Sequence, residues 1–81
     1  MRWWRANRPA APDAVQTDLK AVLALIAVEP GVGSRINTST SSLVRRIYMP
    51  RTGYFAYYRV RDDCIEVLCV WHERRGTRPR V

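Results

Sequence analysis

Three segments with the residue pattern of β-strands follow one another in the second half of the chain. They are rich in aromatic and β-branched residues and cover Leu43–Met49, Tyr54–Arg61 and Cys64–Trp71. Pro50 to Gly53 has proline and glycine at turn positions, and Asp62-Asp63 makes a second turn. Connections this short join antiparallel neighbours, so we expect a three-stranded antiparallel β-meander over residues 43–72. The third segment is the most apolar, which favours a central or well-covered position.

A helical period precedes the strands. Between residues 13 and 28, apolar residues recur at steps of three and four positions, at Val15, Leu19, Val22, Leu23 and Ile26. Pro12 suits the first helical turn, and Asp13 suits the positive end of the helix dipole. Pro30 and the glycines after it end the helix. The sequence therefore predicts an α+β fold, in which one long amphipathic helix packs on the meander within a single domain of 81 residues.

The remaining stretches are interpreted as connections. Residues 1–12 contain Trp3 and Trp4 followed by two prolines, and we expect a basic connector whose indoles pack on the core or on a partner. The longest apolar run, Ala21–Val28, is far shorter than the roughly 20 residues that span a bilayer, and no signal-peptide pattern is present. We therefore expect no membrane partner. Residues 36–42 are expected to be a Ser/Thr-rich loop, and residues 73–81 a basic tail.

Arginine dominates the charged residues. The chain has fourteen basic residues, all arginine except Lys20, against seven acidic ones, so its net charge is +7. Guanidinium groups pair with phosphates and carboxylates, which suits anionic partners, although a GC-rich genome would also favour arginine codons. Arg45 and Arg46 are neighbours in a strand and point to opposite faces, so at most one belongs to a given site. Arg59 and Arg61 have acidic neighbours with which they can simply form ion pairs.

The two cysteines and the single histidine limit the chemistry. Cys64 and Cys69 are five positions apart, and in an uninterrupted strand they would face opposite sides, so no disulfide is expected between them. Free thiols suit a reducing, cytoplasmic location. His72 is the only histidine, and no Cys/His spacing of a zinc site occurs. We expect no metal site and no cofactor.

The order of these segments resembles the C-terminal sheet of the RelE/ParE superfamily, the toxins of type II toxin–antitoxin systems. The resemblance is carried by Val44-Arg45-Arg46, Pro50-Arg51-Thr52-Gly53-Tyr54, Tyr57-Tyr58-Arg59-Val60 and Ile65 to His72, followed by Arg74 and Arg75. Residues 3–12 also look like the family's connection between two helices. Family members usually have a strand and a first helix ahead of this segment. The resemblance therefore implies a toxin fold without that strand and helix, with sheet surface open to a partner or a homodimer.

The resemblance implies one of two activities. ParE-like toxins block DNA gyrase and need no catalytic residues, whereas RelE-like toxins cut mRNA on the ribosome with basic residues, sometimes with His, Glu or Tyr. We favour ParE-like inhibition, because the chain lacks the lysine cluster of the RelE-like nucleases. For RelE-like cleavage, the resemblance implies His72, Arg59 and Arg74 as catalytic residues. An inactive remnant that only binds nucleic acid or an antitoxin is the third alternative.

Either activity implies two partners, a cognate antitoxin and a target, which is gyrase or the ribosome with its mRNA. The residues expected to contact the target or the antitoxin are Arg45, Arg46, Arg51, Tyr57, Arg74, Arg75 and Arg78. The tail arginines have the strongest claim, since Glu73 is the one acidic residue beside them. Structural roles compete elsewhere, because tyrosines commonly fill a small core and a histidine at a strand end commonly makes a structural hydrogen bond.

Overall fold

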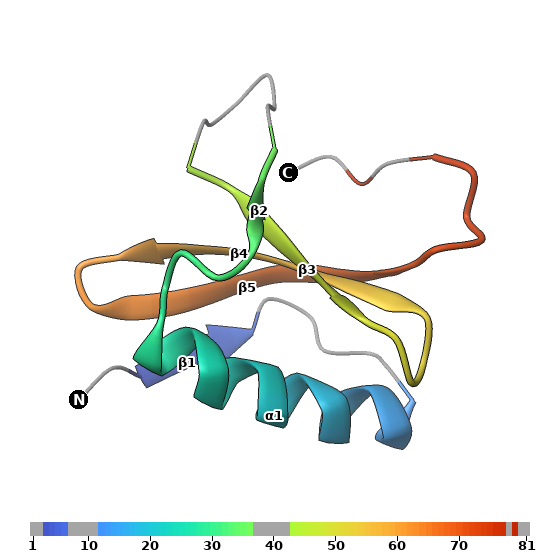
Figure 1. Ribbon diagram of the computed structural model, residues 1–81, viewed down its shortest axis with the longest axis horizontal. Helices are drawn as coiled ribbons and strands as arrows, with labels where there is room; N and C mark the ends of the chain where they lie inside the picture. Colours follow the sequence, from blue (N-terminus) through green and yellow to red (C-terminus); the bar gives the residue numbers. More distant parts are fainter. Residues whose placement is uncertain (1–2, 7–11, 37–42, 78, 80–81) are drawn as a thin grey trace.

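The computed structural model describes residues 3–6, 12–36, 43–77 and 79. Within these ranges the chain forms one helix and five strands, and the helix packs on one face of the sheet (Figure 1). In chain order the elements are β1 (Trp3–Ala6), α1 (Asp13–Val28), β2 (Ser34–Arg35), β3 (Arg45–Met49), β4 (Tyr54–Arg61) and β5 (Cys64–His72). The predicted α+β fold, with one helix on an antiparallel meander, is therefore confirmed in outline.

The helix α1 has the predicted bounds and the predicted buried face. Its buried residues are Val15, Leu19, Leu23 and Ile26. Pro12 lies just before the helix and not in its first turn: its backbone is extended, and its carbonyl accepts the N–H of Gln16 at 3.0 Å. Proline suits this place because no helical hydrogen bond requires its missing N–H. No helix in the described parts of the chain has the length and apolar character needed to cross a membrane.

The sheet has the strand order β1-β5-β4-β3-β2. The meander is confirmed, because β4 pairs antiparallel with both β3 and β5. The predicted number of three strands is wrong. The edge strand β2 was not predicted; its two residues pair antiparallel with Arg45 and Arg46. A strand of two residues is too short to show a period in the sequence.

A second correction concerns the N-terminal residues. Residues 3–6, predicted to belong to a connector, form β1, which pairs in parallel with β5 from Trp3 beside Cys64 to Ala6 beside Val67. The expectation that the chain lacks an N-terminal strand is therefore wrong. So short a strand depends on the partner strand that pairs with it, and its own residue pattern does not reveal it. Residues 7–11 and 37–42, which complete the predicted connector and loop, lie outside the described residues.

The core lies between α1 and the sheet, and Tyr58 is at its centre. Met49, Ala56, Tyr58, Ile65 and Val67 meet the buried helix residues there. The Tyr58 hydroxyl donates to the carbonyl of Pro30 at 3.0 Å and accepts the N–H of Gly33 at 2.9 Å. A Cβ on Gly33 would lie 2.6 Å from that hydroxyl oxygen, so glycine is required at this close approach. Tyr58 thus ties the segment after α1 to the middle of the sheet.

A β-bulge in β5 changes which side chains share a face. Tyr57 is paired with Cys69, but the next residue of β4, Tyr58, is paired with Val67. Leu68 is therefore an extra residue on β5. Side chains after Leu68 alternate out of step with those before it, because one inserted residue reverses the face of every later position.

The bulge overturns the predicted placement of the two cysteines. Ile65 and Val70 both pack toward the core, although an uninterrupted strand would place them on opposite faces. Cys64 and Cys69 consequently both lie on the face away from α1. Both are free thiols, as expected. Five residues of strand separate them by roughly 17 Å, which is too far for a disulfide.

Candidate functional site

The face of the sheet that points away from α1, called here the outer face, carries a row of aromatic and basic side chains. Every second residue of a strand points to this face, so β3 contributes Arg46 and Tyr48, and β4 contributes Phe55 and Tyr57. The bulge in β5 turns Trp71 to the same face, opposite Phe55. Side chains from three neighbouring strands therefore lie side by side.

These side chains contact one another closely. The ring centroids of Tyr48 and Phe55 are 5.0 Å apart, and those of Phe55 and Tyr57 are 6.4 Å apart. The guanidinium carbon of Arg46 lies 4.5 Å from the centre of the Phe55 ring, and its Nη1 donates to the Tyr57 hydroxyl at 3.4 Å. A cation over an aromatic ring contributes roughly 0.5–1 kcal/mol at an exposed site. These contacts favour the position of the Arg46 side chain over Phe55 on the outer face.

The segment after β5, Glu73–Thr77, packs against this row. The guanidinium carbon of Arg75 lies 3.9 Å from the centre of the Trp71 ring, and the indole Nε1 donates to the carbonyl of Thr77 at 2.6 Å. The Tyr48 hydroxyl donates to Oε2 of Glu73 at 2.7 Å. This hydrogen bond, aided by burial and by the negative charge of Glu73, raises the pKa of Tyr48.

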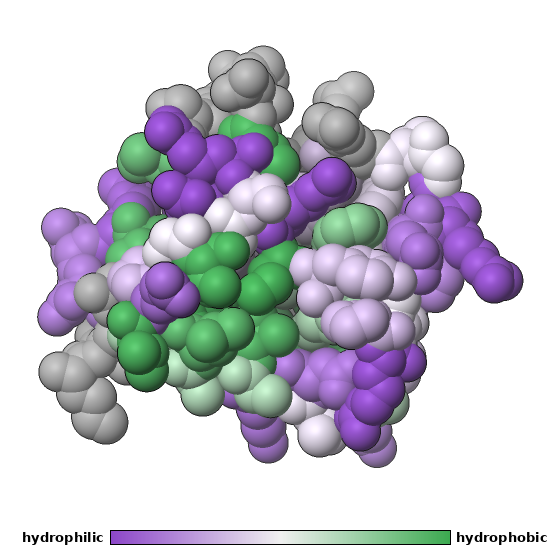
Figure 2. Space-filling view, viewed as in Figure 1, coloured by the Kyte–Doolittle hydropathy of each residue, from purple (hydrophilic) through white to green (hydrophobic). Residues whose placement is uncertain are grey.

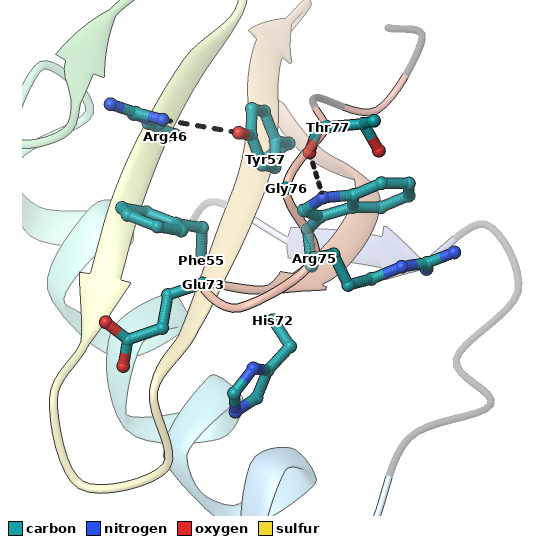
Figure 3. Close-up of a pocket in the computed structure, with 9 residues that line it drawn as sticks. Arg46, Phe55, Tyr57, His72, Glu73, Arg75, Gly76 and Thr77 are labelled. Carbon is teal, nitrogen blue, oxygen red and sulfur yellow. Dashed lines mark hydrogen bonds between the residues drawn. The ribbon is translucent and has the colours of Figure 1, made fainter.

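A pocket of about 280 Å³ lies among these side chains (Figure 3). We call it the aromatic–arginine pocket; it is lined by Arg46, Phe55, Tyr57, Trp71, His72, Glu73, Arg75, Gly76 and Thr77. Figure 3 shows Arg46 on one side of the aromatic side chains and Arg75 on the other. Tyr57 forms the floor, since only 2% of this residue is exposed. The pocket thus offers aromatic surface between two guanidinium groups, which suits anionic or aromatic groups of a partner.

Three of the predicted contact residues, Arg46, Tyr57 and Arg75, meet in this pocket. Arg74 is exposed beside them, and its backbone N–H donates to Nδ1 of His72 at 3.1 Å. Arg78 lies outside the described residues. The structure therefore places part of the predicted contact set together at one end of the sheet.

The other two predicted contact residues make contacts within the fold. Arg45 lies on the face toward α1, where its Nη1 donates to the carbonyl of Gly33 at 2.7 Å. The predicted opposition of Arg45 and Arg46 is thereby confirmed. Arg51 forms a salt bridge with Asp18 of α1, with 2.8 Å between Nη2 and Oδ1. Arg45 thus connects β3 to the segment after α1, and Arg51 connects the β3–β4 turn to α1.

The three residues implied for RelE-like cleavage do not converge. Arg59 forms an ion pair with Glu66 of the neighbouring strand. The His72 ring meets the Tyr54 ring edge-on, with 4.8 Å between the centroids. Five residues of β4 separate Tyr54 from Arg59, which is roughly 17 Å along the strand. His72 and Arg59 thus lie near opposite ends of β4 and β5.

The sequence predictions did not include four residues of this site, Tyr48, Phe55, Trp71 and Glu73. Tyr48 and Phe55 could have been predicted to share the outer face with Arg46 and Tyr57. The alternation in β3 and β4, together with the hairpin turn that sets their register, is the signal for it. No residue pattern marks Leu68 as a bulge, so the face of Trp71 was not predictable. The role of Glu73 depends on contacts with a distant strand.

Other titratable groups in the described residues do not form a second reactive centre. These residues contain no cluster of three or more side chains of the types that hold metal ions. Burial raises the pKa of Cys69 to about 11, so its thiol stays protonated near neutral pH. Burial also raises the pKa of Tyr58, although its hydrogen bond with Gly33 and the charge of Arg45 act in the opposite direction.

The chain matches known proteins both in sequence and in fold. Residues 2–76 match a family model described as the ParE toxin of the type II toxin–antitoxin system parDE. The crystal structure of the isolated E. coli RelE toxin superposes with a TM-score of 0.72 at 18% identity, over 94% of this chain and 88% of that chain. A chain of the intact E. coli RelBE toxin–antitoxin complex superposes with a TM-score of 0.70 at 17% identity, over 93% of this chain and 100% of that chain. A search of curated proteins gives no match. The fold is RelE-like, and the family match shows that the chain belongs to the ParE toxin family of type II toxin–antitoxin systems.

Proposed function

We propose that this chain is a toxin that arrests bacterial growth by binding DNA gyrase, and that a cognate antitoxin neutralises it. The match of the ParE family model over residues 2–76 carries this proposal. The geometry supports the same choice. A cleaving toxin needs an acid, a base and cations around one phosphate, whereas Arg59 and His72 lie far apart. A toxin that acts by binding has no such requirement.

The aromatic–arginine pocket is proposed as the surface that contacts the target. Tryptophan, tyrosine and arginine are the residue types that most often dominate the energy of protein interfaces. Arg46 and Arg75 already lie over aromatic rings, at 4.5 Å and 3.9 Å from the ring centres. Side chains that are ordered in advance lose less conformational entropy on binding, so the pocket is suited to a specific contact.

The antitoxin is proposed to cover a second surface. Figure 2 shows apolar side chains gathered over the C-terminal half of α1, where Leu25 is 45% exposed and Val28 is 85% exposed. Leu43, which is also exposed, lines a hollow of about 230 Å³ together with Arg45 and Arg59. Apolar surface beside arginines suits an amphipathic, acidic segment of another protein, and the net charge of +7 would speed its association.

The proposal is tested by measuring inhibition of gyrase supercoiling with the purified chain, and cleavage of ribosome-bound mRNA in parallel. We expect supercoiling to be inhibited. Arg46→Glu and Arg75→Glu should each weaken inhibition about tenfold or more, as expected for central interface residues. Lys20→Glu makes the same charge change on an exposed position of α1 and should leave the inhibition within about twofold.

Each result has a distinct consequence. Cleavage of ribosome-bound mRNA without an effect on supercoiling would replace the proposal with the RelE-like activity. No effect in either assay, together with no growth arrest on expression, would identify an inactive chain. In cells, growth arrest that is relieved by co-expression of the antitoxin supports the roles of toxin and antitoxin; the two biochemical assays then decide between gyrase and the ribosome.

A further inference from the structure

The segment Glu73–Thr77 is attached to the sheet at two places, the first of which is Glu73. Its backbone N–H donates to the carbonyl of Gly53 at 2.9 Å, and its Oε2 accepts the hydroxyl of Tyr48 at 2.7 Å. Gly53 has a φ of 77°, and a Cβ at this position would lie 2.7 Å from the same Oε2. The turn between β3 and β4 therefore has both the left-handed backbone and the open space that the carboxylate needs.

The second attachment forms one side of the aromatic–arginine pocket. The guanidinium of Arg75 lies over Trp71, whose indole donates to the carbonyl of Thr77. The backbone N–H of Arg75 donates to the carbonyl of His72 at 3.1 Å, so the chain turns tightly between the two attachments. Since Arg75 is only two residues from Glu73, a fixed Glu73 limits the positions that the guanidinium of Arg75 can reach.

Charge alone would not hold Arg75 in this place. Arg46 and Arg75 both line the pocket and repel each other. Arg74 adds a third positive charge next to Glu73. Attachments that do not depend on these arginines oppose this repulsion. They are the hydrogen bond from Trp71 to Thr77 and, before Arg75 in the chain, the hydrogen bonds of Glu73 with β3 and with the β3–β4 turn.

We propose that Glu73 is a positioning residue for the aromatic–arginine pocket. With Tyr48 and Gly53 it forms a latch, called here the Glu73 latch, that holds the C-terminal segment so that Arg75 lies over Trp71. Glu73 acts through Arg75 and does not itself bind the target. The effect on inhibition rests on the proposed function, because a misplaced Arg75 weakens the contact with the target. The position of the segment can be measured on the isolated protein.

The test uses four variants of the full chain: Glu73→Ala, Glu73→Gln, Tyr48→Phe and the double variant Tyr48→Phe/Glu73→Ala. Glu29→Ala is the matched control, since it removes the same charge from the exposed end of α1.

The first measurement is the rate of tryptic cleavage after Arg74 and Arg75, which follows the population in which the segment is detached. Glu73→Ala and Tyr48→Phe should each speed cleavage about two- to fivefold, the range for an exposed charge-assisted hydrogen bond. The double variant should be no faster than Glu73→Ala.

The second measurement is the ionisation of tyrosine, followed by ultraviolet absorbance. Tyr48 should ionise at lower pH in Glu73→Ala than in the wild type, because loss of the carboxylate removes the main cause of its raised pKa. Glu73→Gln keeps an acceptor but no charge, so its ionisation and cleavage should lie between those of Glu73→Ala and wild type. The concentration for half-maximal gyrase inhibition should be highest for Glu73→Ala, intermediate for Glu73→Gln and lowest for wild type. Glu29→Ala should equal wild type.

The latch and the proposed function fail in different ways. Cleavage rates and tyrosine ionisation in Glu73→Ala equal to those of wild type would overturn the latch, whatever the result with gyrase. Additive effects of Tyr48→Phe and Glu73→Ala would also overturn it, because the two residues would then act separately. Coupled changes in cleavage without inhibition of gyrase by any variant, including the wild type, would uphold the latch and reject the proposed target.

Discussion

The substitution Tyr58→Phe tests the idea that one hydroxyl joins the segment after α1 to the sheet. It removes the donor to the carbonyl of Pro30 and the acceptor of the N–H of Gly33. Gly33 is buried, so its unpaired N–H costs about 1–3 kcal/mol. Pro30 is only half-buried, and water can replace the lost donor, which limits the second cost to about 1 kcal/mol. We therefore expect the free energy of unfolding to fall by about 2–4 kcal/mol.

The assay is urea and thermal unfolding followed by circular dichroism. A loss of about 3 kcal/mol lowers the melting temperature by roughly 12–24 °C in a domain of this size. Tyr57→Phe is the matched control, because Tyr57 is also 2% exposed or less but faces the other side of the sheet. Its hydroxyl accepts one long hydrogen bond from Arg46 at 3.4 Å, so we expect a loss below about 1 kcal/mol. Equal losses in the two variants, or a loss below about 0.5 kcal/mol in Tyr58→Phe, would refute this reasoning.

Three further predictions concern pH, a glycine and a thiol. The fold raises the pKa of Tyr58 above its ordinary value of 10.0, so the hydroxyl contributes its full stability below about pH 10 and loses it as pH rises through the folded-state pKa. The difference in unfolding free energy between wild type and Tyr58→Phe, measured by urea unfolding, should therefore shrink as the pH rises above about 10. A constant difference would contradict the raised pKa of Tyr58. Gly53→Ala should cost about 1–2 kcal/mol because its φ is 77°, whereas Gly76→Ala has free space for a Cβ and should cost less than about 0.5 kcal/mol in the same experiment. Cys69 should react slowly with iodoacetamide at pH 8 and faster toward pH 11, as followed by mass spectrometry of its peptide; a rate at pH 8 equal to that of the unfolded chain would show that partial burial does not raise the pKa of this thiol.

Local sequence pattern determined the elements that are long enough to repeat a period. The apolar positions of α1 recur over sixteen residues, and proline and glycine flank them, so the helix bounds followed from the sequence. β4 and β5 are eight and nine residues long and are joined by a two-residue turn, and this pattern determined the antiparallel meander. The opposition of Arg45 and Arg46 followed from alternation alone.

Only the tertiary structure decided the features that depend on a distant partner. Residues 3–6 are a strand because β5 offers them an edge to pair with. Leu68 interrupts the alternation only because of how β5 meets β4, and this places Trp71 beside Phe55. Glu73 becomes part of the site through Tyr48, which lies twenty-five residues earlier in the chain.

The physical reason is the range of the interactions. A helix and a hairpin depend on hydrogen bonds and side-chain contacts between residues close in sequence, so each residue type carries information about its own state. Edge pairing, a bulge and a pocket depend on contacts whose geometry is set by the assembled core, and a single residue carries no signal of them. The sequence by itself therefore determined a basic, aromatic sheet with one covering helix. The tertiary structure decided which of its arginines lie together: among the residues that the structure describes, Arg46 and Arg75 are the arginines that line the pocket.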